Sequence, residues 1–193
     1  MAEESDWPVS EEAAPSPGLV VVTGASHTGK TSVSRALLPL LDAPVAWLGV
    51  DGTLDHVLVR PTADPWQEIP LAYDLLETQI DILLGRSWTV VLESTFTYVP
   101  EQGPPEFHHH AIRAMVAIAE RRGVRHLVAH LTLDSTDAMR RAEDSGRLSP
   151  EIVAQTVALH EAAAMPAPSI KLSTQSANPE ELALATLAAF RRL

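Results

Sequence analysis

Hydrophobic positions along the chain fall into two alternating patterns. Short, continuously apolar runs are typical of strands covered on both faces, and apolar residues spaced three or four apart are typical of amphipathic helices. The runs predict strands at 19–23, 44–50, 88–92, 124–133 and 168–172. The spaced segments predict helices at 71–84, 106–122 and 150–164, one that follows residue 29, and a last one from 179. This alternation predicts an α/β domain with three layers, a five-stranded parallel sheet and helices on both faces.

Local residue types predict where several of these helices begin and end. Pro39 lacks the N–H that a helix interior needs, so the first helix should stop or kink there, and Gly85 is a suitable helix stop. Ser149 and Asn178 are each followed by a proline and then by acids, which is typical of helix N-caps. Residues 52–69 show no clean periodicity and are rich in proline, so they predict an irregular segment on the substrate side.

Composition is that of one ordinary globular domain, with 46% hydrophobic and 20% charged residues in 193. We assign residues 18–193 to this domain and residues 1–17, which are acidic and contain no basic residue, to a disordered tail. The chain lacks cysteine, a signal-peptide pattern and any apolar run of bilayer length, so we expect a cytoplasmic protein with no membrane partner. The net charge of −11 disfavours a nucleic-acid substrate.

The first predicted strand ends in a sequence that matches the Walker A pattern, G-x-x-x-x-G-K-T, from Gly24 to Thr31. Glycines allow such a loop to point successive N–H groups at a phosphate, and the following helix adds the positive end of its dipole. Lys30 would reach the outer phosphates, and the Thr31 hydroxyl would bind Mg²⁺. We expect the loop to bind a nucleoside triphosphate through Gly24, Ala25, Ser26, His27, Thr28, Gly29, Lys30, Thr31 and Ser32.

Acidic residues follow the second and third predicted strands. Asp51 comes directly after 44–50, and Glu93 follows 88–92 and precedes Ser94 and Thr95. In an open α/β sheet, ligands bind beyond the carboxyl ends of the strands, so Asp51 should lie where the acceptor binds. The alternatives are a turn that begins at Asp51 and a Glu93 carboxylate bonded to the backbone.

Three arginines, Arg140, Arg141 and Arg147, lie in a segment that also contains Glu143 and Asp144. Arginines on a mobile lid would close over bound phosphate and exclude water. The alternative is a helix face exposed to solvent.

These motifs resemble those of the small P-loop kinases, the group that includes chloramphenicol phosphotransferase, zeta-toxin-like kinases, gluconate kinase and the kinase half of polynucleotide kinases. The resemblance covers nearly the whole chain from Leu19 and implies the P-loop NTPase fold. It also implies that Asp51 accepts the proton of the acceptor hydroxyl, and that Glu93 and Thr95 lie near the acceptor, with Glu93 beside the Mg²⁺ waters. It further implies a lid at about 135–149 that carries the three arginines, and a nucleobase-side loop at 171–181.

The sequence therefore predicts an ATP- and Mg²⁺-dependent kinase that phosphorylates a hydroxyl of a small molecule, such as a nucleoside-like compound, a sugar or an antibiotic. We expect a monomer or a homodimer. The first alternative is a regulatory P-loop NTPase without a small-molecule acceptor. The second is a 5′-hydroxyl polynucleotide kinase, which the net charge of −11 disfavours.

Other conspicuous residues receive structural interpretations. His108, His109 and His110 are consecutive, so they cannot converge on one ion from a helix. Trp47, Trp66 and Trp88 are assigned to the core or to a pocket wall. His27 differs from the small residues that are usual at its place in the loop, and its role is left open.

Overall fold

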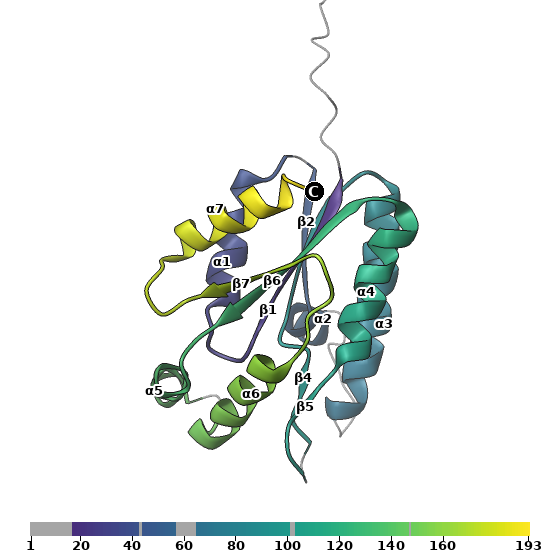
Figure 1. Ribbon diagram of the computed structural model, residues 1–193. Coiled ribbons are helices and arrows are strands. Elements are labelled where there is room, and N and C mark those ends of the chain that lie inside the picture. The colour runs from purple at the N-terminus through teal and green to yellow at the C-terminus, as the bar shows by residue number, and fades with distance from the viewer. Residues whose placement is uncertain (1–16, 43, 57–64, 101–102, 147) are drawn as a thin grey trace, which may run out of the picture.

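The computed structural model describes residues 17–42, 44–56, 65–100, 103–146 and 148–193. Within them, five parallel strands form one sheet in the order β2-β3-β1-β6-β7 (Figure 1). The bounds of these strands are Gly18–Gly24 for β1, Val45–Gly49 for β2, Thr89–Ser94 for β3, Arg125–Thr132 for β6 and Ser169–Ser173 for β7. The predicted fold class, a five-stranded parallel sheet flanked by helices, is confirmed.

The central strand β1 is buried along its whole length because helices cover both of its faces. Leu19 and Val21 pack towards helices α3 (Pro65–Gly85) and α4 (His109–Arg122). Val20 and Val22 pack towards α1 (Lys30–Leu37) and α7 (Pro179–Phe190). Alternate side chains thus enter two separate cores, which explains why the strand is continuously apolar.

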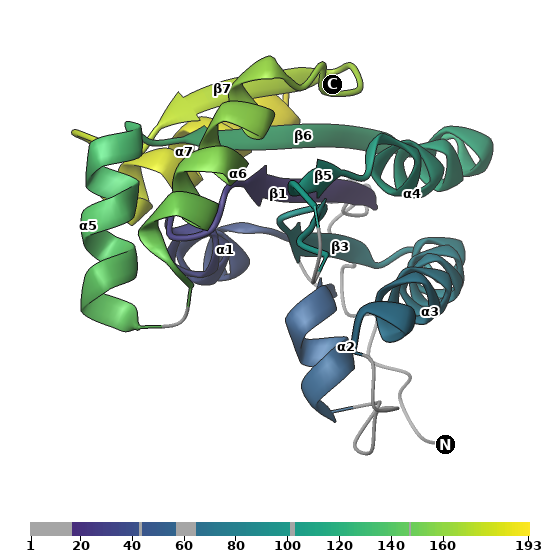
Figure 2. The same ribbon diagram turned by 90° about the horizontal axis from the view of Figure 1, so that it is seen from below.

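Two helices, α5 (Ser135–Ser145) and α6 (Pro150–Ala162), form a pair near the Walker A loop (Figure 2). Ala138 and Ala142 of α5 pack with Val153 and Val157 of α6, and this small core includes Ala25 of the loop. Helix α5 lies within the lid predicted at about 135–149, and α6 follows it; the closing motion of this lid remains a prediction.

Helix caps and stops agree closely with the expectations from sequence. The α1 helix ends at Leu37 and continues into a 3-10 turn, η1 (Leu38–Leu40), that contains Pro39. The Ser149 hydroxyl caps α6. Asn178 and Glu181 form a reciprocal capping box at the start of α7.

Several predicted boundaries are wrong. The second strand ends at Gly49, and a short helix, α2 (Val50–His56), extends into the segment 52–69 that was expected to be irregular. Helix α3 starts at Pro65 and contains Pro70, because buried Ile69, Ala72 and Tyr73 pack it into the core. The predicted helix from residue 106 begins at 109, since Glu106–Phe107 form a short strand β5 that pairs with β4 (Thr97–Tyr98).

The predicted tail at 1–17 falls, except for Pro17, outside the described residues, as does Arg147. None of the helices in the described segments has the length and apolar character that a bilayer crossing requires.

Candidate functional site

The loop between β1 and α1 has a backbone that depends on two glycines. Gly24 has φ +153°, and a Cβ atom there would lie 2.5 Å from the carbonyl oxygen of Leu131 and 2.7 Å from Thr28 Oγ1. Gly29, with φ +86°, occupies the N-cap position of α1 in the left-handed region. His27 also has a positive φ, of 65°, although it carries a side chain. The loop thus has the conformation that a phosphate-binding loop requires.

Lys30 is a buried cation within this loop. Its Nζ donates a hydrogen bond of 2.9 Å to the carbonyl oxygen of Ala25, which also accepts a bond of 2.8 Å from the Thr28 hydroxyl. Burial lowers the pKa of Lys30 from 10.5 to about 8, although the charges of Glu93 and Asp51 act in the opposite direction. Lys30 is therefore close enough to Glu93 and Asp51, the two predicted acids, for their negative charges to act on it.

Thr31 and Glu93 meet directly. The Thr31 hydroxyl donates a 2.5 Å hydrogen bond to Glu93 Oε1, and Glu93 Oε2 is buried and has no hydrogen-bond partner among the described residues. Hydroxyl and carboxylate oxygens are the hard ligands that Mg²⁺ prefers, and Mg²⁺ usually takes only one or two protein ligands beside phosphates and water. The unpaired Oε2 therefore fits a divalent cation. The described residues contain no cluster of three His, Cys, Asp or Glu side chains that would hold a metal without phosphate.

Asp51 reaches the same region from β2. It lies in the first turn of α2 rather than at the end of a strand, and the Thr53 hydroxyl donates to the carbonyl oxygen of Gly49 at 3.0 Å, which ties this helix to β2. Gly49 lies in register with Glu93 on the neighbouring strand β3. Asp51, two residues beyond the end of β2, and Glu93, near the end of β3, therefore lie at the carboxyl ends of adjacent strands of the parallel sheet.

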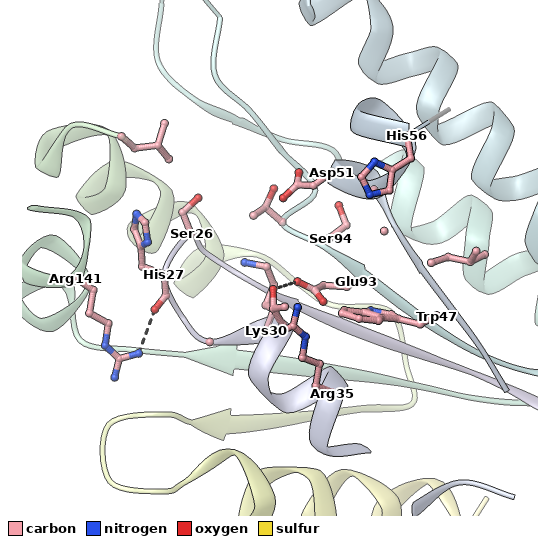
Figure 3. A pocket seen from close by; sticks show the side chains of 17 residues that line it. Ser26, His27, Lys30, Arg35, Trp47, Asp51, His56, Glu93, Ser94 and Arg141 are labelled. Atoms are coloured by element: carbon pink, nitrogen blue, oxygen red, sulfur yellow. Dashed lines mark hydrogen bonds between the residues drawn. The ribbon is translucent and has the colours of Figure 1, made fainter. Parts of the chain in front are cut away.

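A cavity of about 860 Å³ joins these groups (Figure 3). The predicted site residues that line it are Ser26, His27, Gly29, Lys30, Thr31, Asp51, Glu93, Thr95 and Arg141. Gly24, Ala25, Thr28 and Ser32 belong to the loop and its helix but do not line this cavity.

The predicted arginines occupy different places. Arg141 lines the cavity, and its Nη1 donates a 3.1 Å hydrogen bond to the carbonyl oxygen of His27 in the loop. Arg140 does not line the cavity, and its exposed side chain pairs with Asp137 at 2.9 Å on the same helix. Their roles, and that of Arg147, remain predictions.

Sequence reasoning missed several residues in and next to the cavity. Among them, Arg35 and His56 line the cavity. Tyr73 does not line it, but its hydroxyl bonds with Ser94, which does, and burial raises the pKa of Tyr73 to about 12. Tyr73 falls within a run of apolar helix positions, so nothing in the sequence distinguishes it from an ordinary core residue.

Two buried histidines lie behind the loop. His160 of α6 contacts the Thr97 hydroxyl through Nε2 at 3.1 Å, and its ring lies 5.6 Å from that of His130. Burial, with a further contribution from the Lys30 charge, lowers the pKa of His160 to about 3. Burial, followed by the charge of Lys171, lowers the pKa of His130 to about 4. Both imidazoles are therefore neutral near pH 7.

The histidines at 108–110 lie at the start of α4. His109 and His110 are exposed, and His108 packs beside Tyr73 and Tyr98 at ring distances of 5.7 Å. Trp47 is part of the cavity wall, one of the two places predicted for it.

A Walker A loop follows the central strand, and acids lie at the carboxyl ends of the two strands on one side of it. This arrangement defines a P-loop NTPase fold of the kind that small kinases have. This confirms the resemblance inferred from the motifs. The chain belongs to the family described as AAA domain, which matches residues 19–167. No curated protein matches the chain in sequence.

Solved structures with the same fold include three named proteins. The tunicamycin resistance protein of Deinococcus radiodurans has a TM-score of 0.63 and 14% identity, over 90% of this chain and 95% of that one. The APS kinase of Mycobacterium tuberculosis has a TM-score of 0.62 and 14% identity, over 92% and 99%. A gluconokinase of Sinorhizobium meliloti has a TM-score of 0.57 and 18% identity, over 91% and 93%. At these identities the likeness shows a shared fold.

Proposed function

We propose that this protein is a kinase that transfers the γ-phosphate of ATP, with Mg²⁺, to a hydroxyl group of a small molecule. The observation that carries the proposal is the convergence of Lys30, Asp51 and Glu93 on one cavity. A regulator that only binds or hydrolyses a nucleotide needs the lysine and a metal ligand. A kinase needs in addition a carboxylate at the acceptor hydroxyl, and Asp51 lines the same cavity as Lys30 and Glu93.

The loop and α1 serve the nucleotide in this proposal. Backbone N–H groups from Ser26 to Lys30 would hold the phosphates, and Lys30 would exchange its bond to Ala25 for a phosphate oxygen. Thr31 and Glu93 are the residues that would hold Mg²⁺, which when bound neutralises charge on the β- and γ-phosphates.

Asp51 serves the acceptor. The acceptor oxygen forms a bond to the γ-phosphorus while the bond from that phosphorus to the β,γ-bridging oxygen breaks, and ADP leaves. The hydroxyl proton passes to the Asp51 carboxylate, whose exposed position in the cavity allows a substrate to approach. Arg141 is the arginine best placed to contact phosphate, because it already lies against the loop.

The test begins with the wild-type protein, labelled ATP, Mg²⁺ and a panel of hydroxylated metabolites and antibiotics. Asp51→Asn keeps the shape of the side chain but removes its charge. We expect transfer to the identified acceptor to fall by roughly 10²–10⁴. ATP affinity, measured by calorimetry on the same preparation, should change far less because the loop and Lys30 carry the nucleotide.

Asp55→Asn is the matched control, since Asp55 is exposed on the same short helix and does not line the cavity. It should transfer phosphate at the wild-type rate. Phosphate transfer at the wild-type rate in the Asp51→Asn variant would show that Asp51 is not the base. ATP turnover that no hydroxyl compound stimulates, together with no labelled product, would favour the regulatory NTPase instead.

A further inference from the structure

One wall of the cavity is formed by a cation and an aromatic ring that the proposed reaction does not use. The guanidinium of Arg35, on α1, lies 5.7 Å from the centre of the Trp47 ring. Trp47 is 39% exposed although it is large and apolar, and it belongs to β2, an edge strand of the sheet. Both side chains line the cavity, and Figure 3 shows them on the far side of Glu93 from Asp51.

The position of Arg35 follows from helix geometry. Residues four apart share one face of a helix, so Arg35 lies one turn beyond Thr31 on the same side of α1. The nucleotide loop lies at the other end of that face, where Lys30 and Arg141 already supply positive charge. Arg35 is therefore a cation of the cavity that lies away from the loop.

Within the part of the chain that the structure describes, no acidic side chain neutralises the charge of Arg35. Its side chain is exposed, and none of the residues that the structure describes forms an ion pair or hydrogen bond with it. The chain as a whole carries a net charge of −11, so an arginine with no acidic partner among the described residues is unusual in this protein. The flat indole holds the guanidinium by a cation–π contact and leaves its N–H groups available for an anion.

We propose that Arg35 and Trp47 form a subsite for an acidic group of the acceptor, so that the substrates are small hydroxylated acids. The guanidinium would bind a carboxylate or phosphate through paired hydrogen bonds, and the ring or hydrocarbon skeleton of the acceptor would lie on the indole. This inference rests on the proposed function, because it assigns the substrate class of the same cavity. It places the reacting hydroxyl at Asp51 and the acidic group across the cavity at Arg35.

Binding is tested with the loop occupied by a non-hydrolysable ATP analogue and Mg²⁺, so that no added anion can enter it. The probes are matched pairs that differ in one charge: 4-hydroxybenzoate and its amide, a nucleoside 5′-monophosphate and its nucleoside, and an aldonic acid and its aldose. The indole N–H signal of Trp47, assigned from the Trp47→Leu spectrum, reports occupancy of the subsite. We expect the acid of at least one pair to shift this signal and to bind about tenfold or more tightly than its neutral partner.

Arg35→Gln should abolish that preference, and Trp47→Leu should weaken both members of the pair because it removes the flat surface but not the charge. Arg113→Gln, which removes an exposed arginine on α4, controls for net charge and should keep the preference. The pair that responds distinguishes a carboxylate from a phosphate. A wild-type protein with no preference in any pair, or a preference that survives in Arg35→Gln, overturns the subsite.

Transfer of labelled phosphate to the same probes separates the two proposals. An acid that binds through Arg35, in a protein that phosphorylates none of the hydroxylated compounds tested, leaves the subsite standing and contradicts the kinase. A neutral acceptor that is phosphorylated through Asp51, with the same rate in Arg35→Gln, leaves the kinase standing and contradicts the subsite.

Discussion

Lys30 carries its charge in a place where water is nearly excluded. The residue is 9% exposed, and burial lowers its pKa to about 8. A buried ammonium loses its hydration, and the two carboxylates in the cavity offset only part of that loss. The protein without nucleotide therefore holds a destabilising charge that a phosphate group would stabilise.

Replacing this lysine should raise stability and abolish nucleotide binding at the same time. Lys30→Met keeps much of the volume and removes the charge, so we expect the free energy of unfolding without nucleotide to rise by about 1–3 kcal/mol. ATP with Mg²⁺ at a hundred times its Kd should stabilise the wild type by about 2.7 kcal/mol and the variant by almost nothing. Chemical denaturation with and without nucleotide measures both quantities.

Lys171→Met is the control for this experiment, since Lys171 is exposed and is the other lysine of the sequence. It should not raise the stability of the protein without nucleotide. A Lys30→Met variant that nucleotide stabilises as much as the wild type would contradict the assignment of Lys30 to the phosphates.

At the scale of elements, the long strands and the capped helices could be predicted because each has a strong local cause. Continuous apolar runs specify the buried strands, and Asn178 with Glu181 specifies the start of α7. Helix α2 could not be predicted, since its seven residues include Asp51, Gly52 and Thr53, which have low helix propensity. It forms where the chain leaves β2 and packs against α3, and no local pattern records that contact.

The residues of the candidate site also fall into two groups, those that could be predicted from the sequence and those that could not. The loop residues and Glu93 follow from a motif and from the end of a strand, so they could be predicted. Arg35 and Tyr73 could not, because the place of Arg35 in the cavity and the contact of Tyr73 with Ser94 depend on how α1 and α3 pack against the sheet.

Helix α5 carries two adjacent arginines whose roles could not be distinguished from the sequence. Arg141 points to the loop and bonds to the His27 carbonyl, while Arg140 pairs with Asp137 along its own helix. We therefore expect Arg141→Gln to lower phosphoryl transfer by roughly 10²–10³, the loss typical of a transition-state donor. Arg140→Gln should lower it much less. Steady-state rates and melting temperatures of both variants check this, and equal losses would contradict the distinction.

At the scale of the whole molecule, two neutral histidines are buried in the interior: His130 in β6 and His160 in α6. An imidazole that is neutral in the folded protein but titrates near 6.5 in the unfolded chain takes up its proton on unfolding. Below pH 6.5 the unfolded state therefore binds more protons, and the free energy of unfolding falls as the pH falls. The free energy of unfolding continues to fall down to about pH 4 for His130 and about pH 3 for His160, the pKa values of the two rings in the folded protein.

Stability should consequently decrease by about 1 kcal/mol for each of these histidines between pH 7 and pH 5.5. His160→Gln, which can retain a hydrogen bond to Thr97, should lose about half of this pH dependence. Urea denaturation at a series of pH values measures the slope. His109→Gln controls for the loss of an imidazole at an exposed position, and a His160→Gln slope equal to that of the wild type would argue against the buried neutral ring.

The carbonyl oxygen of Ala25 has a consequence for how the loop would accept a nucleotide under the proposed function. That oxygen receives hydrogen bonds from the Lys30 ammonium, the Thr28 hydroxyl and the Thr28 amide, so it keeps two donors after the lysine turns away. The exchange proposed for Lys30 would therefore leave this carbonyl paired. We expect nucleotide binding to need the rotation of the Lys30 side chain, which is faster than the rearrangement of a loop.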